Sequence, residues 1–578
     1  MSVEPTTAPV TIEHERPWHQ WYESTVPINL DVPEHDLPEF LRNTAERYPK
    51  RDAIRFLGRA ISFSELDADV NRMANALLEY GVEPGDRVAL MMPNSPQMVI
   101  CYYGVMRAGA IVVPTNPLYT ARELQHQLRD SGARIVVCLS RMFKKLQGVR
   151  NELPDLESVI VTNIKEYLPL VSRIYFTLAR EKKEGHAVDL PDDGRTFWLP
   201  EFLKRGRRSH PGVSRHPDDV AVLQYTAGTT GTPKGVMLTH RNLVIGALHA
   251  QVWTANVERP AGHDVVLGVI PVFHPLAQTT VMNYPISAGA TTVLLPRFTV
   301  AETLEAIQKE RPNMFPGVPS LFRVLLESRD IDKYQLDSLQ ACICGAAPLP
   351  RDVQSRFEAL AGVRMVEGYG LTEAPVTHCN PMLGERREGS IGVPLPNTDA
   401  MIVDLEDRSV RLGPGETGEL AVRGPQVMRG YWQREDRTAE NLIDGWYYTG
   451  DTGIMDEDGF FRLVDRKSDM IIVGGYNVFP SEIEKVIAEH PQVHEVAVAR
   501  VTDPRRGEAP RAFVVPKDGA DLSRRDILSH CRENLAHYKV PRSVEFRKEL
   551  PKNLLGKVLR RELVESSSEP ASDQTEEE

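Results

Sequence analysis

The sequence predicts an α/β protein with a large N-terminal domain of βα sheets, a barrel-like β subdomain and a small α+β domain at the C-terminal end. Three observations predict this architecture. Strands and helices alternate for most of the length, which is typical of a mostly parallel sheet covered on both faces. Between residues 390 and 465 short apolar runs are separated by Gly and Pro, which favours antiparallel strands. Beyond residue 465 helices and strands form a shorter, compact stretch.

Helix caps and apolar runs mark the elements in order. Ser64-x-x-Asp67 has the pattern of a helix start, and Gly81 follows as a stop signal. Thr120-x-x-Glu123 marks a second helix start. The other predicted elements are strands at 88–92, 110–113 and 134–138, a helix that reaches residue 107, helices from Ser481 and Ser523, and strands at 494–501, 511–516 and 543–547.

Composition and charge exclude several classes of protein. With 41% hydrophobic and 26% charged residues, the chain has the composition of a globular protein rather than of collagen or a disordered chain. The formal net charge of −12 argues against a nucleic-acid-binding surface. The scattered cysteines form no disulfide framework, and the first residues lack the apolar core of a signal peptide. No apolar run reaches the ~20 residues of a spanning helix, so we expect a cytoplasmic protein.

We expect the chain to divide where its composition changes. Residues 1–30 form an N-terminal extension, residues 31–465 the large domain with the β subdomain at 390–465, and residues 466–563 the small domain. The tail at 564–578 is rich in acidic and polar residues and has no basic ones. Because such a tail is too polar to pack, we predict that it is disordered.

Residues 165–185 have the pattern of a basic amphipathic helix. Such a helix can lie on an anionic membrane surface, which would give the protein a peripheral membrane contact. The alternative is a surface helix packed on its own domain, and the sequence leaves both interpretations open. On a helical wheel Leu170, Val171, Ile174, Tyr175 and Leu178 share one face, Arg173 and Arg180 lie opposite, and Lys182-Lys183 follows.

The stretch from Tyr225 to Gly235 predicts a phosphate-binding loop. It follows an apolar strand and combines hydroxyl-bearing residues with spaced glycines and Lys234. In such a loop, backbone N–H groups and hydroxyls converge on phosphate oxygens. It is not a Walker A loop, because Gly235 rather than Ser or Thr follows the lysine. A structural turn would require only a Gly and a Pro, so the phosphate interpretation is favoured.

Five motifs together resemble the signatures of the AMP-forming adenylating superfamily, which includes acyl-CoA synthetases, firefly luciferase and the adenylation domains of peptide synthetases. They are the loop at 225–235, Glu367–Glu373 (EGYGLTE), Trp446–Asp451 (WYYTGD), Asp465–Asp469 (DRKSD) and Pro551–Lys557 (PKNLLGK). Within this superfamily, the NPLYT motif at 116–120 and the stretch around the third motif look most like bacterial long-chain fatty-acid–CoA ligases. The resemblance implies that 31–465 is an AMP-binding domain and that the C-terminal domain is mobile.

The resemblance implies an acid–thiol ligase that uses a fatty acid, ATP and CoA with Mg²⁺. The carboxylate attacks the α-phosphorus of ATP, pyrophosphate leaves, and CoA then takes the acyl group from the acyl-adenylate and releases AMP. Because two anions must meet in the first step, charge neutralisation and alignment dominate catalysis. The implied catalytic residues are Lys557, which bridges the carboxylate and the α-phosphate, Thr372, which contacts that phosphate, and Glu373.

The resemblance assigns the remaining site residues to the substrates and the metal. It places the departing phosphates on Thr226, Ala227, Gly228, Thr229, Thr230, Gly231 and Lys234, and Mg²⁺ on Thr226 and Glu373. It places adenine among Gly345, Ala346, Glu367, Gly368 and Tyr369, ribose on Asp451 with Arg466, and CoA against Gly474 and Gly475. It places His274 and Gly317 in the acyl site, whose chain-length preference stays open, while a merely packed or exposed histidine remains the alternative for His274.

Two other ligases and one non-enzyme remain as alternatives. A fatty-acyl-AMP ligase would load a carrier protein, but the chain lacks the inserted segment typical of those enzymes. An aryl-CoA ligase of the 4-coumarate type shares the same motifs. A non-catalytic nucleotide-binding or membrane-scaffolding protein would require decayed motifs, whereas Lys557, Glu373 and Asp451 are intact. Ser468 stands at the domain pivot where relatives usually have Asp or Lys, and Gln278 stands where some long-chain relatives carry an aromatic gate. The sequence leaves the oligomeric state open, with a homodimer as one alternative.

Overall fold

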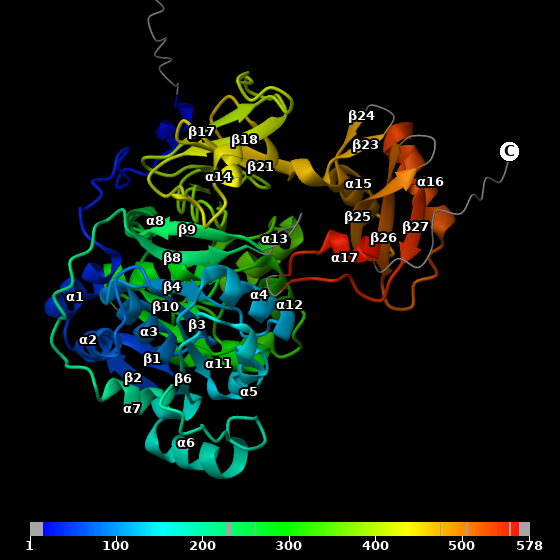
Figure 1. The fold of residues 1–578 in the computed structure, drawn as a ribbon. Helices are drawn as coiled ribbons and strands as arrows, with labels where there is room; N and C mark the ends of the chain where they lie inside the picture. Colours follow the sequence, from blue (N-terminus) through cyan, green and yellow to red (C-terminus); the bar gives the residue numbers. More distant parts are fainter. Residues whose placement is uncertain are drawn as a thin grey trace, which may run out of the picture.

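The computed structural model describes residues 16–226, 233–260, 262–473, 476–503, 507–553 and 556–565. Within these residues the strands form four sheets. Figure 1 shows a large body built from the N-terminal part of the chain and a smaller C-terminal unit beside it. The predicted α/β class, with a large and a small domain, is confirmed.

An eight-stranded sheet carries the predicted phosphate loop. Its order is β19-β9-β8-β4-β3-β5-β6-β7, and its strands are β3 (Arg87–Met91), β4 (Ile111–Pro114), β5 (Ile135–Leu139), β6 (Ser158–Thr162), β7 (Thr196–Trp198), β8 (Val220–Tyr225), β9 (Gly235–Thr239) and β19 (Gly430–Tyr431). The strands from β8 to β7 are parallel, while β9 returns antiparallel to β8. The loop therefore joins two adjacent strands at one edge of the parallel part.

A nine-stranded sheet supplies the other predicted site segments. Its order is β16-β15-β14-β13-β12-β10-β11-β1-β2, and its strands are β1 (Asp52–Phe56), β2 (Arg59–Ser62), β10 (Val265–Gly268), β11 (Thr291–Leu294), β12 (Met314–Gly317), β13 (Ala341–Cys344), β14 (Arg364–Tyr369), β15 (His378–Cys379) and β16 (Val393–Pro394). β10 to β14 are parallel neighbours, so their carboxyl ends meet at one edge. Cys342 and Cys344 are fully buried in β13, as their alternation predicts.

Helices cover and join these two sheets. They are α1 (Leu37–Arg47), α2 (Phe63–Glu79), α3 (Pro96–Arg107), α4 (Ala121–Ser131), α5 (Ser140–Val149), α6 (Leu170–Tyr175), α7 (Leu199–Leu203), α8 (His240–Trp253), α9 (Pro275–Ala277), α10 (Tyr284–Ala288), α11 (Val300–Glu310), α12 (Pro319–Leu326) and α13 (Arg351–Ala361). The shorter helical turns of this part are η1 (Pro17–Trp21), η2 (Arg150–Glu152), η3 (Ile164–Tyr167), η4 (Phe176–Arg180), η5 (Gln278–Asn283) and η6 (Ile331–Lys333).

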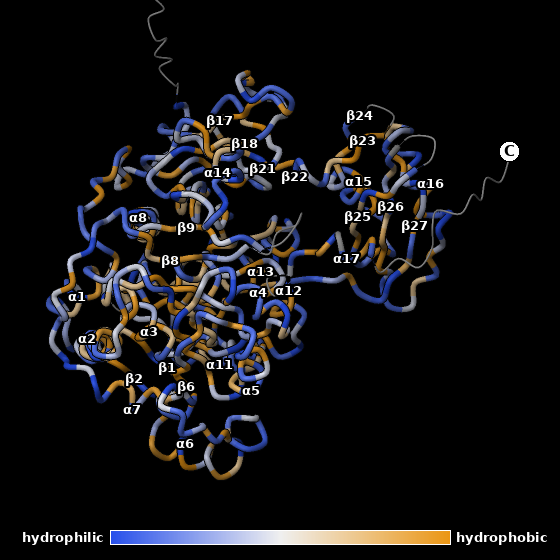
Figure 2. Tube along the Cα trace, in the orientation of Figure 1, coloured by the Kyte–Doolittle hydropathy of each residue, from blue (hydrophilic) through white to orange (hydrophobic). Residues whose placement is uncertain are grey.

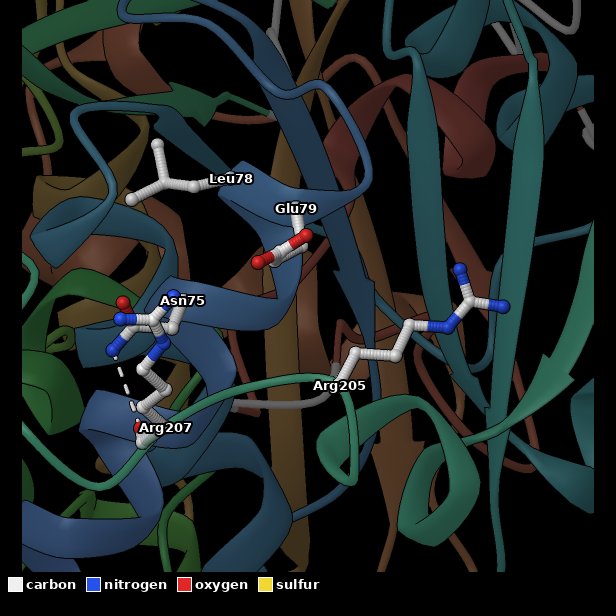
Figure 3. Close-up of a pocket in the computed structure, with 5 residues that line it drawn as sticks. All are labelled: Asn75, Leu78, Glu79, Arg205 and Arg207. Carbon is white, nitrogen blue, oxygen red and sulfur yellow. Dashed lines mark hydrogen bonds between the residues drawn. The ribbon is translucent and has the colours of Figure 1, made fainter.

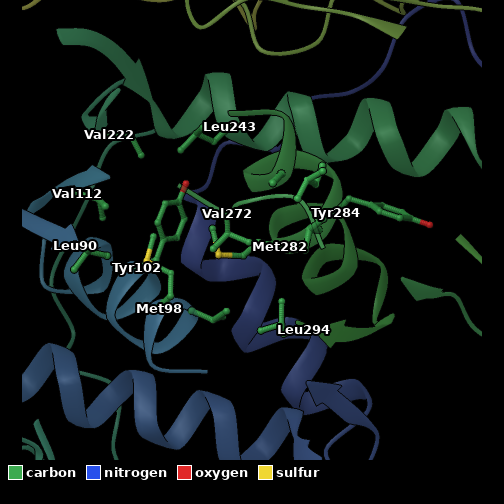
Figure 4. Packing of buried hydrophobic residues seen from close by; sticks show 14 of the residues in the cluster. Leu90, Met98, Tyr102, Val112, Val222, Leu243, Val272, Met282, Tyr284 and Leu294 are labelled. Carbon is green, nitrogen blue, oxygen red and sulfur yellow. The ribbon is translucent and has the colours of Figure 1, made fainter. Parts of the chain in front are cut away.

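The main core is one continuous cluster of buried apolar side chains that joins both sheets and the helices around them. Every residue of α3 is buried, which explains why its sequence is apolar all round rather than amphipathic. Figure 4 shows part of this core, where Tyr102 of α3, Leu243 of α8 and Met282 of η5 converge.

The predicted β subdomain is an antiparallel sheet. It contains β17 (Asp399–Val403), β18 (Gly418–Arg423), β20 (Leu442–Ile443), β21 (Trp446–Met455) and β22 (Phe461–Arg466), with α14 (Glu435–Asn441) beside it. The order is β17-β18-β21-β20, and β22 also pairs with β21. Over the described residues this path stays open rather than closing into a ring. Asp451 of β21 lies opposite Arg466 of β22, so two predicted site residues are neighbours in the ladder.

The C-terminal unit has its own sheet and core. It contains β23 (Ile471–Val473), β24 (Tyr476–Val478), β25 (Val493–Asp503), β26 (Gly507–Pro516), β27 (Ser543–Phe546), α15 (Pro480–Ala488), α16 (Arg524–Asn534), α17 (Arg560–Glu565), η7 (Lys467–Asp469) and η8 (His537–Lys539). Ile471, Ile483 and Ile527 pack in a cluster separate from the main core. Residues 1–15 and 566–578 lie outside the described residues. Val564 and Glu565, predicted to begin the tail, instead end α17.

Two predicted helix starts differ from the structure. α2 begins two residues earlier than predicted, because Ser62 and Glu65 form the capping box. Both Ser62 and Ser64 fit the cap preference, and the end of β2 selects the first. Ser481 lies inside α15, whose N-cap is Phe479. The predicted caps at Thr120 and Ser523 are confirmed.

Candidate functional site

The hairpin of β8 and β9 holds the base of the phosphate loop. The Thr226 amide donates a hydrogen bond to the Lys234 carbonyl at 3.1 Å. Ala227, Gly228, Thr229, Thr230 and Gly231 lie outside the described residues. The Lys234 ammonium lies 4.5 Å from the centroid of the Tyr431 ring, a cation–π distance. The loop lysine is thus positioned by β19, from a distant part of the sequence.

Tyr431 also connects this lysine to the EGYGLTE motif. Its hydroxyl donates to Glu373 Oε1 at 2.9 Å, and the Tyr447 hydroxyl lies 3.4 Å from it. Burial, with Glu373 beside it, raises the pKa of Tyr431, so this hydroxyl stays a donor. Thr372 and Glu373 are half-buried. Tyr431 therefore links Lys234, one predicted phosphate residue, to Glu373, one predicted metal residue. Tyr431 lies in no matched motif, so the sequence did not indicate it.

A second cluster joins three motifs around Asp451. The Tyr369 hydroxyl donates to Asp451 Oδ2 at 2.6 Å, and Arg466 Nε lies 3.1 Å from Asp451 Oδ1. Asp451 is only 5% exposed. Burial and the adjacent carboxylate raise the pKa of Tyr369. The carboxylate is thus fixed by two donors from β14 and β22, as a ribose-binding group needs to be.

Small residues line the ends of β13 and β14. A Cβ on Gly345 would lie 3.2 Å from the Gly368 carbonyl oxygen, so the two glycines approach closely. Ala346 has φ of +69°, a conformation that larger side chains rarely adopt. Burial raises the pKa of Glu367 to about 8, which leaves its carboxyl group mostly protonated at neutral pH. The glycine and alanine residues at these strand ends are therefore small and closely spaced.

Lys557 lies beside the Asp451 cluster although it comes from the last loop of the chain. Burial lowers its pKa to about 8, and the nearby Arg466 acts in the same direction, while Asp451 opposes the shift. Its amide donates to Asn553 Oδ1 at 2.9 Å. The structure therefore brings together the lysine, the nucleotide motif and the hinge motif that the sequence predicts for one site.

Gly556 explains how the lysine loop docks. Its φ is +79°, and a Cβ there would lie 2.5 Å from Ser320 Oγ on α12. α12 follows directly on Gly317, so the segment predicted to line the acyl site also receives the lysine loop. Nearby, Arg323 of α12 lies 4.0 Å from Glu495, which Lys552 contacts at 2.5 Å. Ser320, which no sequence motif indicated, is therefore a contact for the lysine loop.

The resemblance implies acyl-adenylate formation, and we expect Gly556→Ala to lower the rate of that step about tenfold, because the methyl group both clashes with Ser320 and strains the left-handed backbone. Pyrophosphate release in single-turnover experiments measures this rate. Gly519→Ala is the matched control, since Gly519 has φ of +74° with open space around its Cβ position. If Gly556→Ala and Gly519→Ala have the same rate, the contact with Ser320 does not limit the step. The same conclusion follows if adding Ser320→Gly does not restore the rate of Gly556→Ala.

The hinge segment is held on both sides by ion pairs, since Lys467 pairs with Glu419 of β18 and Asp469 pairs with Arg560 of α17. Lys467 pairs with the buried Glu419 at 3.1 Å, and Glu419 Oε1 also accepts from the Gly450 amide at 3.1 Å. Burial raises the pKa of Glu419, but hydrogen bonds from Arg408 and Lys467 outweigh that effect and hold the pKa below its ordinary value. The Ser468 hydroxyl donates to Asp469 at 3.2 Å. Gly474 and Gly475 lie outside the described residues.

The predicted acyl residues lie at the ends of β10 and β12. His274 caps α9, and burial lowers its pKa to about 4, so its imidazole is neutral. The Gly317 carbonyl accepts from the Gly345 amide at 3.2 Å, which places the acyl and adenine segments side by side. Gln278 is buried and donates to Gln224 at 2.7 Å. It therefore belongs to a polar chain inside the core.

Two hollows differ in their relation to the predicted acyl segments. A small cavity of about 10 Å³, room for about one water, lies under the acyl segment, with Thr280, Pro316 and Ile343 in its wall. A surface hollow of about 350 Å³ lies at α2 and is lined by residues that include Glu79, Arg205 and Arg207 (Figure 3). This larger hollow contains none of the predicted site residues.

Comparisons with known proteins agree with the motifs. The AMP-binding enzyme family matches residues 41–432, and the AMP-binding enzyme C-terminal domain matches residues 482–557. The long-chain-fatty-acid–CoA ligase of Bacillus subtilis (strain 168) is 43% identical over 96% of this chain and 99% of its own. The long-chain-fatty-acid–CoA ligase of Salmonella typhimurium is 40% identical over 94% of this chain and 97% of its own. A feruloyl-CoA synthase of Amycolatopsis sp is 36% identical over 90% of this chain and 96% of its own.

Solved structures of relatives share the fold over most of the chain. ATP-bound MatB from Rhodopseudomonas palustris is 29% identical and superposes with a TM-score of 0.81, covering 92% of this chain and 99% of its own. Apo MatB, with the same identity and coverage, gives a TM-score of 0.71. Over the aligned chain this protein is thus more similar to the ATP-bound MatB structure than to the apo MatB structure. With matched models over most of its length and relatives of this identity, the chain belongs to the AMP-binding enzyme family, the adenylate-forming superfamily that its motifs resemble.

Proposed function

We propose that this protein is a long-chain fatty acid–CoA ligase, which forms an acyl-adenylate from a fatty acid and ATP and then transfers the acyl group to CoA. The position of Lys557 carries the proposal. A lysine of the C-terminal unit, poorly solvated and next to Arg466 and Asp451, supplies positive charge where a carboxylate and the α-phosphate would meet. The names of the bacterial relatives support the fatty acid as the acid substrate.

Each residue has a defined task in this proposal. Lys234 and the loop before it hold the departing phosphates, Thr372 contacts the α-phosphate, and Asp451 accepts hydrogen bonds from the ribose. Tyr369 offers its ring to adenine while its hydroxyl fixes Asp451. Lys557 draws the carboxylate and the α-phosphate together. All these groups align and neutralise the reactants, which is the main requirement of phosphoryl chemistry between anions.

Mg²⁺ belongs to the proposal through Glu373 and Thr226. In the described residues no three His, Cys, Asp or Glu side chains converge as a protein cage for a metal would need. Magnesium usually keeps several waters and binds through one or two carboxylates and the substrate phosphates, so one half-buried glutamate near the phosphate loop fits it. When bound, the ion would offset the charge of the phosphate oxygens.

The same proposal covers the layout of the chain and its surroundings. We place the AMP-binding domain at 31–465, the mobile domain at 466–563, and the CoA arm against Gly474 and Gly475. The six cysteines, which are all free and buried, support a cytoplasmic location. A homodimer would be tested by sedimentation equilibrium. No helix of the described residues is long and apolar enough to cross a membrane; a peripheral contact through 165–185 is argued below.

A panel of acids tests the substrate. Acyl-CoA and pyrophosphate are measured with ATP, CoA and saturated acids from acetate to stearate, with coumarate and ferulate added because a feruloyl-CoA synthase is also similar. We expect the highest kcat/KM with a medium or long fatty acid. Higher activity with an aryl acid or acetate would contradict the assignment, and accumulation of acyl-AMP in saturating CoA would favour the carrier-loading alternative.

We expect kcat/KM of the adenylation step to fall above about pH 8. Lys557 must be protonated to neutralise charge, and burial lowers its pKa to about 8, so the active form dominates below that pH and is lost above it. ATP–pyrophosphate exchange between pH 6.5 and 9.5 measures this limb. Lys557→Arg keeps its charge throughout the range, so its profile should stay flat above pH 8. A wild-type profile without the decline would mean that Lys557 does not titrate there.

A further inference from the structure

A group of large apolar side chains lies exposed on α6 and η4. Their exposed fractions run from 52% to 83%. Figure 2 shows this apolar turn at the surface, and Figure 1 places it at the end of the large body opposite β17 and β18. The members of this apolar face are Leu170, Val171, Ile174, Tyr175 and Leu178. These five side chains therefore do not pack on the protein's own domain.

The helix is fixed with this face outward. Phe176, on the opposite side, is 6% exposed and packs its ring edge-on against His186, with the centroids 5.5 Å apart. The Arg173 guanidinium donates to the carbonyls of Lys165 and Glu166, so Arg173 serves the fold and not a partner. These contacts hold the helix so that its apolar face points away from the protein.

A neighbouring turn extends the apolar face. A Cβ on Gly58 would lie 3.6 Å from the Pro169 ring, so the β1–β2 turn adjoins the start of α6. Leu57 in that turn is 41% exposed. Contiguous exposed apolar side chains of this kind are uncommon on monomers and mark contact surfaces.

The charges around the face identify the partner. Residues 165–185 contain five basic and three acidic side chains, in a chain whose net charge is −12. Arg180 pairs with Glu184, and Lys165 with Glu181, which leaves Lys182 and Lys183 as exposed cations directly after η4. An apolar face with a basic rim complements an anionic bilayer, where side chains enter the acyl region and lysines meet the headgroups.

We propose that α6 and η4 dock the enzyme onto an anionic lipid surface, with the five apolar side chains inserted and Lys182 and Lys183 at the phosphate level. Docking would place the enzyme where fatty acids partition. The proposal does not depend on which acid the enzyme activates. It also needs no transmembrane helix. The face is ordered before it meets lipid, so little conformational entropy is lost on binding.

Co-sedimentation of the full-length protein with phosphatidylglycerol/phosphatidylcholine vesicles tests the proposal. The triple variant Leu170→Gln, Ile174→Gln, Leu178→Gln should bind at least about tenfold more weakly, since each side chain loses its buried apolar area. The matched control, Leu360→Gln, Leu383→Gln, Val410→Gln, changes three other exposed apolar residues and should bind like wild type. Lys182→Glu with Lys183→Glu should weaken binding and remove its salt dependence.

A local probe gives a second readout. Because all six native cysteines are buried, an environment-sensitive dye on Leu178→Cys should shift to the blue with vesicles, whereas the same dye on Leu383→Cys should not. Thermal unfolding and activity on decanoate without vesicles should match wild type in every variant. Wild-type protein that stays in solution with anionic vesicles at low salt overturns the proposal. A wild-type dimer that becomes a monomer in the triple variant, with no vesicle binding, would assign the face to a second copy.

Discussion

We expect Lys557→Ala to lower the rate of acyl-adenylate formation by about 10²–10³-fold, the usual effect of removing one preorganised charge from a transition state. Thioester formation from supplied acyl-adenylate and CoA should change little. The reason is geometric: the lysine loop docks on Ser320 through Gly556 in the present arrangement, and the proposed domain rotation withdraws it before CoA enters. Rapid-quench measurement of each half-reaction separates the two effects.

Lys552→Ala is the matched control for this variant. Lys552 lies in the same loop and contacts Glu495 rather than the Asp451 cluster, so its removal should change the adenylation rate by no more than severalfold. Equal losses in both half-reactions of Lys557→Ala would point to one fixed site or damaged folding. An unchanged first half-reaction would refute the role of the lysine.

The second large effect concerns ATP binding. Asp451→Ala should raise the KM for ATP by about ten- to a hundredfold, because hydrogen bonds to a charged group contribute roughly 1.5–3 kcal/mol each. The change removes the acceptor proposed for the ribose and leaves Tyr369 and Arg466 without the partner that now holds them at 2.6 and 3.1 Å. Initial rates of pyrophosphate release against ATP concentration measure the change.

Tyr369→Phe separates the proposed contact of Asp451 with ribose from the hydrogen bond by which Tyr369 orients Asp451. The variant keeps the ring beside adenine and removes only the hydrogen bond to Asp451, so its KM for ATP should rise far less than that of Asp451→Ala. A KM for Asp451→Ala within twofold of wild type would show that the carboxylate does not carry nucleotide binding.

The sequence predicted the fold and the grouping of the motifs because both depend on short, local patterns. Alternating apolar runs place β3, β4 and β5 in a parallel sheet, and the motifs bring Tyr369, Asp451 and Arg466 together. Local caps were less certain, since Ser62 and Ser64 fit the same rule and only the strand before them selects Ser62.

Contacts between distant segments could not be predicted in this way. Tyr431 meets Lys234 and Glu373 through the pairing of β19 with β9, and no local pattern encodes that pairing. The contact of Ser320 with Gly556 depends on how the C-terminal unit sits against α12. The amphipathic pattern of 170–178 was visible, but only its packing shows that Phe176 is the inward anchor and the other apolar residues face outward.

Oxygen-isotope transfer shows whether this enzyme joins a fatty acid to CoA through an acyl-adenylate. A fatty acid labelled with ¹⁸O in its carboxylate is turned over with ATP and CoA, and the nucleotide and phosphate products are analysed by mass spectrometry. If the carboxylate attacks the α-phosphorus, each turnover leaves one ¹⁸O in AMP and none in pyrophosphate. Label in inorganic phosphate with ADP as the nucleotide product, or AMP without label, would rule out attack of the carboxylate on the α-phosphorus.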